Sequence, residues 1–430
     1  MIDIVIYGRG KTGQNLYKLL QKQGKTPIFF DDSKGFDFLY QFSQNTTVIV
    51  SPGVKPTAKG LLLAKRCGAK IVGELEYCFP LCKSPCVSVT GTNGKTTTCQ
   101  LIYHILQSCN KSAYLLGNGG VPFAQHVLDC TASDIVVLES SSFQLYHCNN
   151  FAPKVSLFTN LAVDHLDYHK NMADYSLAKQ NNFLYQQSDC FAIFNADDKN
   201  TLALSQKSKC NTLFYSTTNV HANCYLRNNN VVLKLFGNVQ KCSAKAISQM
   251  FVHNQSNCLG AILACSILGV TLCDCMQAIS TFTFPDHRMQ VVDSFCNVTF
   301  VDDSKGTNVH ATVSACRCIK GNLALILGGS QKGYCFDDIF TNLPPTVKYV
   351  CASGQTATDI ANCGKKYGII VHIFDDLKEC VQSSFYVLKN IGGTVLMSNA
   401  CASFDKFSGY AQRGDYFRQL VEELKIENQV

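Results

Sequence analysis

A glycine-rich string is the clearest sign of chemistry in the sequence. Residues 89–97 read Val-Thr-Gly-Thr-Asn-Gly-Lys-Thr-Thr, after an apolar run at 87–89 and before a helix-like run at 99–106. In such a loop, backbone N–H groups surround phosphate oxygens, Lys95 contacts the β- and γ-phosphates, and the hydroxyl of Thr96 binds Mg²⁺. The sequence therefore predicts a nucleoside triphosphate site at residues 91–97.

A second glycine-rich turn follows the first apolar run. Residues 8–13 read Gly-Arg-Gly-Lys-Thr-Gly, and Asp31 and Asp32 come about twenty residues later. The glycines allow a pyrophosphate to approach the backbone N–H groups at a helix start. Any diphosphate nucleotide can use this turn, and a close-packed strand–helix turn would look the same. The pattern indicates an anionic ligand without identifying it.

Two further strings place possible metal ligands after strands. Glu139 ends the apolar run 135–138 and precedes three serines, so its carboxylate and the Thr96 hydroxyl could hold Mg²⁺ beside a triphosphate. A helix cap or a surface charge is the alternative for Glu139. Residues 164–169, Asp-His-Leu-Asp-Tyr-His, follow the run 155–158 and are dense in potential ligands.

The C-terminal third repeats this arrangement. Residues 300–308 and 327–332 each place polar side chains after an apolar run. Asp303, Lys305, Thr307 and Lys332 together would suit anionic groups, although each alone could be ordinary loop chemistry.

Short apolar runs alternate with longer amphipathic stretches, which is typical of βαβ units with parallel sheets. The predicted strands are residues 2–7, 48–50, 87–89, 135–138, 155–158, 191–194, 323–327, 349–352, 369–373 and 394–397. The proline-containing stretch 80–85 and the Phe284-Pro285-Asp286 stretch divide the chain, and a new strand is expected near Val291. The prediction is an α/β protein of three domains, at 1–83, 84–284 and 285–430. The polar stretch 217–230 is predicted to be a hairpin or a surface loop.

Composition excludes several classes of protein. The 430 residues are 46% hydrophobic and 16% charged, which argues against disorder and against a coiled coil. Lys+Arg 38 less Asp+Glu 31 leaves +7, and the basic residues are scattered, so no nucleic-acid surface is expected. No apolar stretch approaches the roughly 18 residues of a membrane span, and the start of the chain does not resemble a signal peptide. We expect a cytoplasmic protein with no membrane or nucleic-acid partner.

The 24 cysteines are spread along the chain and are expected to be mostly reduced core thiols. Cys78, Cys82 and Cys86 are evenly spaced, but Pro80 and Pro85 break any helix that would align them as metal ligands. No C-x-x-C pair occurs.

The string Thr-Gly-Thr-Asn-Gly-Lys-Thr at residues 90–96 resembles the ATP loop of the Mur ligases and of folylpolyglutamate synthetase. The resemblance to Mur ligases extends over nearly the whole chain, through residues 51–53, 138–145, 164–167, 175–179, 195–198, 287–288, 303–308 and 400–407. The last of these strings resembles the D-glutamate-adding branch in particular. The resemblance implies a Rossmann-like N-terminal domain, a central ATPase domain with a mostly parallel sheet, and a Rossmann-like C-terminal domain.

The resemblance also implies a role for individual residues. It assigns Lys95, His165, Lys179 and Arg288 to catalysis and Gly91, Thr92, Asn93, Gly94, Lys95, Thr96, Thr97, Asn257, Arg288 and Asp303 to ATP. The UDP-linked substrate is assigned to Gly10, Lys11, Thr12, Asp31, Ser51, Asn118 and His165, and the amino acid to Lys305, Thr307, Lys332, Ser403, Phe404 and Tyr410. Magnesium is assigned to Thr96, Glu139, His165 and Lys179, the lysine as a carbamate. Without the resemblance, Lys179 would be interpreted as a solvated helix lysine.

The implied activity is ATP-dependent addition of D-glutamate to UDP-N-acetylmuramoyl-L-alanine through an acyl phosphate, by a monomer that uses Mg²⁺. A sister Mur ligase or folylpolyglutamate synthetase adding another amino acid is the nearest alternative. An NAD-dependent oxidoreductase would leave residues 91–97 unexplained. A non-catalytic nucleotide-binding regulator would have no need for Thr307, Lys332 and Ser403.

Overall fold

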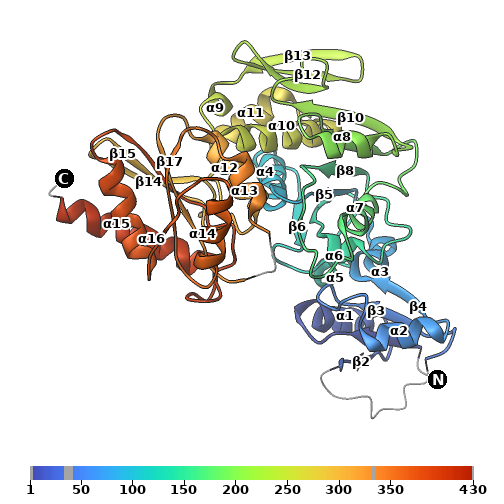
Figure 1. Cartoon of the computed structure of the whole chain (residues 1–430). Helices are drawn as coiled ribbons and strands as arrows, with labels where there is room; N and C mark the ends of the chain where they lie inside the picture. The colour runs from blue at the N-terminus through green and yellow to red at the C-terminus, as the bar shows by residue number, and fades with distance from the viewer. Residues whose placement is uncertain (1–2, 33–41, 332–334, 429–430) are drawn as a thin grey trace. The chain divides into compact units, whose positions relative to one another are not determined.

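The computed structural model describes residues 3–32, 42–331 and 335–428 (Figure 1). Its contacts divide the chain into two compact units, Met1–Phe282 and Thr283–Val430. The first unit contains a four-stranded and a nine-stranded sheet, and the second contains a six-stranded sheet. The predicted α/β class with mostly parallel sheets is confirmed, whereas the exact boundaries of the three domains stay predictions.

The N-terminal sheet is parallel throughout, in the order β2-β1-β3-β4. Its strands are β1 (Ile4–Tyr7), β2 (Ile28–Phe30), β3 (Thr47–Val50) and β4 (Lys70–Gly73), with helices α1 (Lys11–Lys22), α2 (Lys59–Arg66) and α3 (Glu74–Cys78) and the 3₁₀ turn η2 (Phe79–Leu81). The strand order reverses at β1, so the loops after β1 and β3 lie side by side. Open α/β sheets bind ligands at such a switch point.

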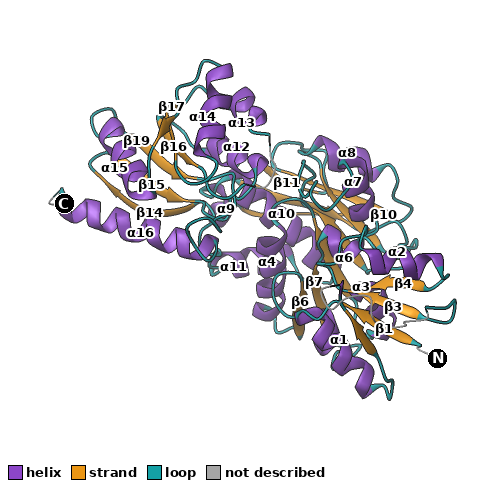
Figure 2. Cartoon of the chain, turned by 60° about the horizontal axis from the view of Figure 1, so that its bottom comes forward, coloured by secondary structure: helices purple, strands orange, loops and turns teal. Residues whose placement is uncertain are grey.

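The nine-stranded sheet has the order β13-β12-β11-β10-β9-β8-β5-β7-β6. Its strands are β5 (Cys86–Thr90), β6 (Ala113–Gly117), β7 (Ile135–Glu139), β8 (Val155–Phe158), β9 (Phe191–Asn195), β10 (Asn211–Ser216), β11 (Cys224–Arg227), β12 (Asn230–Leu235) and β13 (Asn238–Ser243). The helices are α4 (Lys95–Ser108), α5 (Phe123–His126), α6 (Ser142–Leu145), α7 (Met172–Gln180), α8 (Lys199–Ser205), α9 (Lys245–Ser248), α10 (Val252–Ile267) and α11 (Leu272–Ser280) (Figure 2). β5 lies between β7 and β8, which makes it the switch point of this sheet.

One hydrophobic core joins these two sheets. It includes Ile6 and Ile49 of the N-terminal sheet, Leu16 of α1, and Phe123 and Leu138 of the nine-stranded part. Because protein interiors are close-packed, this shared core fixes the position of one sheet relative to the other. The loops after β1 and β3 are therefore held relative to the loops after β5 and β7.

The second unit contains a sheet of order β14-β15-β19-β16-β17-β18, in which β14 is antiparallel and the other pairs are parallel. The strands are β14 (Gln290–Phe295), β15 (Val298–Asp302), β16 (Leu323–Leu327), β17 (Val347–Ala352), β18 (His372–Ile373) and β19 (Gly393–Met397). The helices are α12 (Val309–Cys318), α13 (Asp337–Asn342), α14 (Ala357–Lys366), α15 (Leu377–Leu388) and α16 (Tyr410–Glu427).

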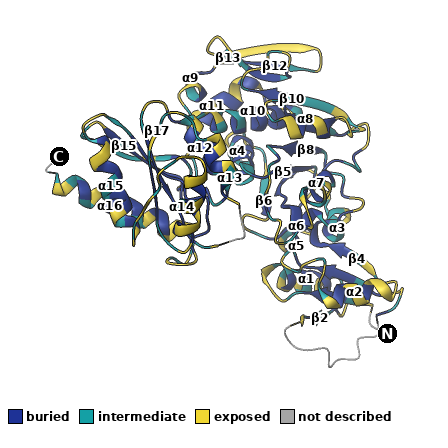
Figure 3. Cartoon of the chain, viewed as in Figure 1, coloured by how far each residue is buried: buried dark blue, intermediate teal, exposed yellow. Residues whose placement is uncertain are grey.

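The strands that the sequence predicts best are the buried ones. Every residue of β5, β7, β8 and β16 is buried (Figure 3), because helices cover both faces of a parallel sheet. The predicted strand 369–373 shortens to two exposed residues. The predicted hairpin region 217–230 contains β11, which pairs with β12 and extends the antiparallel part to β13.

None of the helices in the described part of the chain is both long enough and apolar enough to cross a bilayer.

Candidate functional site

The phosphate loop lies between the central strand β5 and the N-terminus of α4. Gly91 and Gly94 have φ values of +147° and +85°, which glycine adopts without strain. A Cβ on Gly91 would lie 1.9 Å from Thr159 Oγ1, and one on Gly94 would lie 2.6 Å from Asn257 Oδ1. The loop therefore requires both glycines, and Asn257 of α10 packs directly against it.

The loop after β8 holds the phosphate loop in shape. Asn160 accepts a hydrogen bond from Asn93 N at 2.9 Å and donates one to Asn93 O at 3.1 Å. Its carbonyl accepts from Thr92 N, and Thr159 Oγ1 donates to Asn93 O. Sequence reasoning did not identify Thr159 and Asn160, although their position directly after a buried strand was the signal that could have found them.

Two lysines converge on one carbonyl oxygen of this loop. Lys95 Nζ donates to Gly91 O at 2.9 Å and to Thr92 O at 2.8 Å, and Lys179 Nζ of α7 donates to the same Gly91 O at 2.8 Å. Lys179 is 1% exposed, so it is not the solvated helix lysine that its sequence alone suggested. Burial, and then the nearby Lys95 charge, hold the pKa of Lys179 well below its ordinary value. The amine of Lys179 is thereby biased towards its neutral form.

Glu139 and Asn118 meet at the end of the neighbouring strands β7 and β6. Asn118 Nδ2 donates to Glu139 Oε1 at 3.1 Å, and Asn118 N donates to the Glu139 carbonyl at 2.8 Å. Glu139 lies opposite Val89 in the β5–β7 register and is 4% exposed. It forms no ion pair with any described residue, so its carboxyl group is buried beside the phosphate loop without a described cationic partner.

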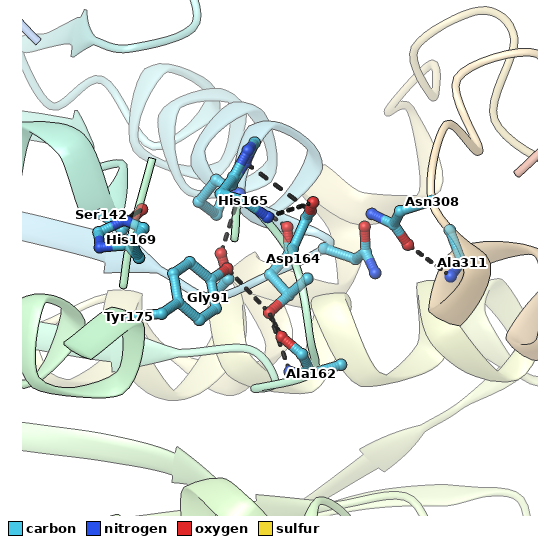
Figure 4. A network of polar contacts seen from close by, with 12 residues as sticks. Gly91, Ser142, Ala162, Asp164, His165, His169, Tyr175, Asn308 and Ala311 are labelled. Carbon is cyan, nitrogen blue, oxygen red and sulfur yellow. Dashed lines mark hydrogen bonds and ion pairs between the residues drawn. The ribbon is translucent and has the colours of Figure 1, made fainter. Parts of the chain in front are cut away.

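His165 lies on the loop after β8, with a positive φ of +54°. Asp164 Oδ1 accepts from His165 N at 2.9 Å, and Asp164 Oδ2 lies 3.7 Å from His165 Nε2 (Figure 4). The Tyr175 hydroxyl lies 3.1 Å from Thr92 Oγ1, and that oxygen accepts from Ala162 N. The His165 loop and α7 are thus both tied to the phosphate loop through Thr92.

A buried histidine in the same loop connects two further elements. His169 Nε2 lies 2.9 Å from Ser142 Oγ, which follows the Glu139 carboxylate along the chain. His169 Nδ1 lies 3.5 Å from Asp174 Oδ2, at the start of α7. Burial lowers the pKa of His169, which favours the neutral ring. The loops after β7 and β8 are therefore linked through one imidazole.

The N-terminal turn also brings its predicted residues together. Ser51, after β3, donates from its hydroxyl to Gly8 O at 3.4 Å, and a Cβ on Gly13 would lie 2.1 Å from that same carbonyl. Gly10 caps α1, with Lys11 and Thr12 in its first turn. Asp31 follows the neighbouring strand β2. Gly10, Lys11, Thr12, Ser51 and Asp31 therefore share the switch-point edge of this sheet.

Direct hydrogen bonds connect that edge to the nine-stranded part. Lys11 Nζ donates to Gly120 O at 2.7 Å, two residues after Asn118. Lys55 Nζ donates to Asp167 O at 2.9 Å, and the Tyr168 hydroxyl donates to Val54 O at 3.0 Å. The residues assigned to the UDP-linked substrate thus form one continuous region with the Asn118 and His165 loops.

In the second unit, the predicted residues lie at the carboxyl ends of β15 and β19. Asp303 is 7% exposed, and its Oδ2 accepts from Ser398 Oγ at 2.6 Å. Burial raises the pKa of Asp303 to about 7, and the positive charge of Arg288 acts in the opposite direction. Arg288 and Asp303 are therefore close enough to influence each other.

The residues assigned to the amino acid lie on three loops. Lys305 Nζ lies 4.9 Å from the centre of the Tyr410 ring, and Thr307 is half-buried in the loop after β15. Ser403 is 2% exposed whereas Phe404 is 74% exposed. Lys332 lies outside the described residues.

Arg413 organises these loops, and sequence reasoning did not identify it. It is 3% exposed, and it donates from Nε to Ser304 Oγ at 2.9 Å and from NH2 to Ser304 O at 2.7 Å. It also donates to the Cys401 and Ala402 carbonyls. The planar guanidinium, with five N–H donors in a fixed fork, bonds to both loops at once. An isolated arginine on a helix gave no signal in the sequence.

Comparisons with known proteins give matches over most of the chain. A family model described as Mur ligase middle domain matches residues 89–265, and one described as Mur ligase, glutamate ligase domain matches residues 287–401. The UDP-N-acetylmuramoylalanine--D-glutamate ligase of Clostridioides difficile (strain 630) is 33% identical over 445 residues, which cover 98% of each chain.

Solved structures share the fold. MurF from Acinetobacter baumannii has a TM-score of 0.61 at 14% identity and covers 94% of this chain and 98% of its own. MurF ligase from Thermotoga maritima, solved in complex with ADP, has a TM-score of 0.58 at 15% identity and covers 89% and 96%. At such identities the likeness concerns the fold alone.

Proposed function

Because this chain belongs to the Mur ligase family, we propose that it catalyses ATP-dependent joining of D-glutamate to UDP-N-acetylmuramoyl-L-alanine, a step of peptidoglycan precursor synthesis. The observation that carries this proposal is the likeness to the Clostridioides difficile ligase over 98% of both chains. A sister ligase or folylpolyglutamate synthetase is not favoured by that comparison. A cytoplasmic location and a monomeric state stay predictions.

The reaction must bring two anions together. The γ-phosphoryl group of ATP is transferred to the substrate carboxylate, which gives an acyl phosphate and ADP. The amino group of D-glutamate then attacks the acyl carbon, and phosphate leaves from the tetrahedral intermediate. Neutralising charge is the main catalytic task. Lys95 is the cation that we assign to the phosphates, because its Nζ already lies at the phosphate loop, where it donates to Gly91 O and Thr92 O.

Magnesium fits the residues around the loop. Glu139 offers a buried carboxylate that lacks a described cationic partner, and Thr96 offers a hydroxyl in the first turn of α4. In the described part of the chain, no three His, Cys, Asp or Glu side chains are grouped closely enough to hold a metal ion. The proposed ligands therefore include the Thr96 hydroxyl and a modified Lys179 in addition to Glu139 and His165. When bound, the ion neutralises charge on the transferring group.

Carbamylation of Lys179 is supported by its surroundings. CO₂ reacts with a neutral amine, and Lys179 is buried and shares its acceptor with the charged Lys95. Both features favour the neutral amine. The Tyr175 ring lies 4.8 Å from Lys179 Nζ and limits the directions that the side chain can take. A carbamate would replace the neutral amine with an anionic oxygen donor beside Gly91 of the phosphate loop.

The remaining assignments also belong to this proposal. We assign Asn257, Arg288 and Asp303 to ATP, and we assign Lys305, Thr307, Lys332, Ser403, Phe404 and Tyr410 to D-glutamate. Two lysines and two hydroxyls suit a substrate that carries two carboxylates better than they suit alanine or lysine.

Phosphate release tests the proposed function. The full chain is supplied with ATP, Mg²⁺ and UDP-N-acetylmuramoyl-L-alanine, and a panel of amino acids is added one at a time. D-Glutamate should give the largest kcat/KM, by at least about a hundredfold over D-alanine and L-lysine. Comparable rates with D-alanine or L-lysine would assign the chain to a sister ligase, and release without any amino acid would refute ligation.

A further inference from the structure

Three cysteine thiols meet where the chain passes from the N-terminal sheet to the nine-stranded sheet. Cys82 follows η2, Cys86 is the first residue of β5, and Cys130 lies in the turn after α5. They are remote from the phosphate loop at the other end of β5 and are independent of the proposed ligase reaction. Cys78, which precedes Cys82 by four residues, is fully buried.

The distances within this thiol trio are short. Cys82 Sγ lies 3.8 Å from Cys86 Sγ, and both sulfur atoms lie 3.6 Å from Ser84 O. Cys130 Sγ lies 3.1 Å from His126 O and within hydrogen-bonding reach of the Cys82 thiol, and its single S–H can donate to one of the two at a time. A disulfide has an S–S distance of about 2.05 Å, so the Cys82 and Cys86 sulfur atoms need to approach by less than roughly 2 Å.

The three thiols differ in accessibility. Cys86 and Cys130 are 1% and 2% exposed, whereas Cys82 is half-buried and open to small solutes. Cys82 lies in the loop that precedes β5, while Cys86 is fixed by the pairing of β5 with β7. Cys82 is therefore the thiol of the three that meets solvent, and it lies outside the strand that holds Cys86.

The environment also favours the reactive form of Cys82. Hydrogen bonds from the Cys130 and Cys86 thiols lower the pKa of the Cys82 thiol, and the same contacts raise the pKa of the two partners. The thiolate is the nucleophile in thiol oxidation, and these pKa directions favour the thiolate at Cys82 over the thiolate at either neighbour.

We propose that Cys82 is a peroxide-reactive thiol and that Cys86 captures its oxidised form as a disulfide. The Cys82 thiolate attacks one oxygen of hydrogen peroxide, the O–O bond breaks, and hydroxide leaves, which gives a sulfenic acid. The Cys86 sulfur then attacks the Cys82 sulfur, and the S–O bond breaks. Hydroxide takes the Cys86 proton and leaves as water. The first hydroxide takes up the proton that Cys82 released on ionising, so two thiols are oxidised and one peroxide is reduced to two waters.

Peptide mapping of the full chain tests this proposal. The protein is treated with hydrogen peroxide, remaining thiols are alkylated, and trypsin cleaves after Lys83. A Cys82–Cys86 bond therefore links two separate peptides, which reduction releases. Cys82 should be oxidised at least about tenfold faster than Cys67, an exposed cysteine that serves as the internal reference.

Two variants separate the steps. Cys86→Ser should accumulate a sulfenic acid at Cys82, which dimedone traps, and Cys82→Ser should abolish the linked peptides. Cys67→Ser, the matched control, should leave both results unchanged. Oxidation of Cys82 no faster than that of Cys67 would overturn the proposal, and so would linkage of Cys82 to Cys130 in place of Cys86.

Discussion

Replacing Lys179 by methionine should separate stability from activity. Methionine has nearly the same length and no charge, so it fills the space beside the Tyr175 ring. The variant loses the hydrogen bonds to Gly91 O and Thr90 Oγ1, which contribute about 1 kcal/mol each. It also removes an amine whose burial is unfavourable when protonated. We expect a folded protein whose stability near neutral pH is close to that of the unmodified chain and whose ligase activity is nearly lost.

The lowered pKa of Lys179 also predicts how the free energy of unfolding changes with pH. The pKa of Lys179 is lowered in the folded chain, whereas an unfolded lysine has a pKa of about 10.4. Between these two values the unfolded chain binds the proton and the folded chain does not. The free energy of unfolding therefore rises with pH, by about 1.4 kcal/mol per unit for one proton. Between pH 7.5 and 9.5 the unmodified chain should gain up to about 2.7 kcal/mol relative to Lys179→Met.

Urea denaturation followed by far-UV circular dichroism measures this difference. Buffers are purged of CO₂ so that no carbamate forms, and the midpoint is recorded at each pH for both proteins. Lys170→Met serves as the control, because Lys170 is exposed on the same segment. Parallel pH curves for the unmodified chain and Lys179→Met would show that Lys179 stays protonated, and would refute the argument for a neutral amine.

The other predictions concern the phosphate loop and the second unit. Lys95→Ala should lower kcat by about 10²–10³-fold without unfolding the chain, because it removes the charge that meets the transferring group, and near-normal phosphate release would contradict this. Gly94→Ala should lower kcat/KM for ATP at least about tenfold, since its Cβ would meet Asn257 Oδ1 at a φ of +85°. Gly237→Ala, with a similar φ of +76° and open space around it, should leave ATP kinetics unchanged. Arg413→Met should raise KM for D-glutamate at least about tenfold by releasing the loops that contain Ser304 and Cys401. An unchanged KM would separate Arg413 from the amino-acid site.

Several parts of the site could be predicted because local chemistry dictates them. The phosphate loop needs glycine at two positive-φ positions and a lysine in the first helical turn, so Gly91, Gly94 and Lys95 are visible in the sequence itself. Buried parallel strands such as β5 and β16 are uninterrupted apolar runs. Both signals depend on neighbouring residues only.

Other parts depend on residues far apart in the sequence. Lys179 lies 88 residues from the carbonyl that it contacts, and its helix α7 packs through Tyr175 into a core cluster that includes Phe158 of β8. Arg413 and Ser304 are 109 residues apart. Strands β4 and β6 begin with partly exposed residues, so their patterns are too weak to identify without the sheet. The residues next to a lysine or an arginine in the sequence do not reveal whether its side chain is buried.

The Gly91 carbonyl shows how these distant contributions combine. Two amines donate to one oxygen, and an arrangement with both amines charged would be opposed by their mutual repulsion and by desolvation of Lys179. The repulsion and the desolvation cost are both lowest when Lys95 is charged and Lys179 is neutral. A bound triphosphate would draw Lys95 towards its oxygens, and a carbamate on Lys179 would turn the second amine into an anion. The loop would then be flanked by the carbamate and by Glu139, so binding the nucleotide would require further positive charge. In this argument the neutral amine allows the carbamate to form, and the carbamate creates the proposed dependence on Mg²⁺. The pH dependence of stability described above tests the first of these steps, the neutral state of Lys179.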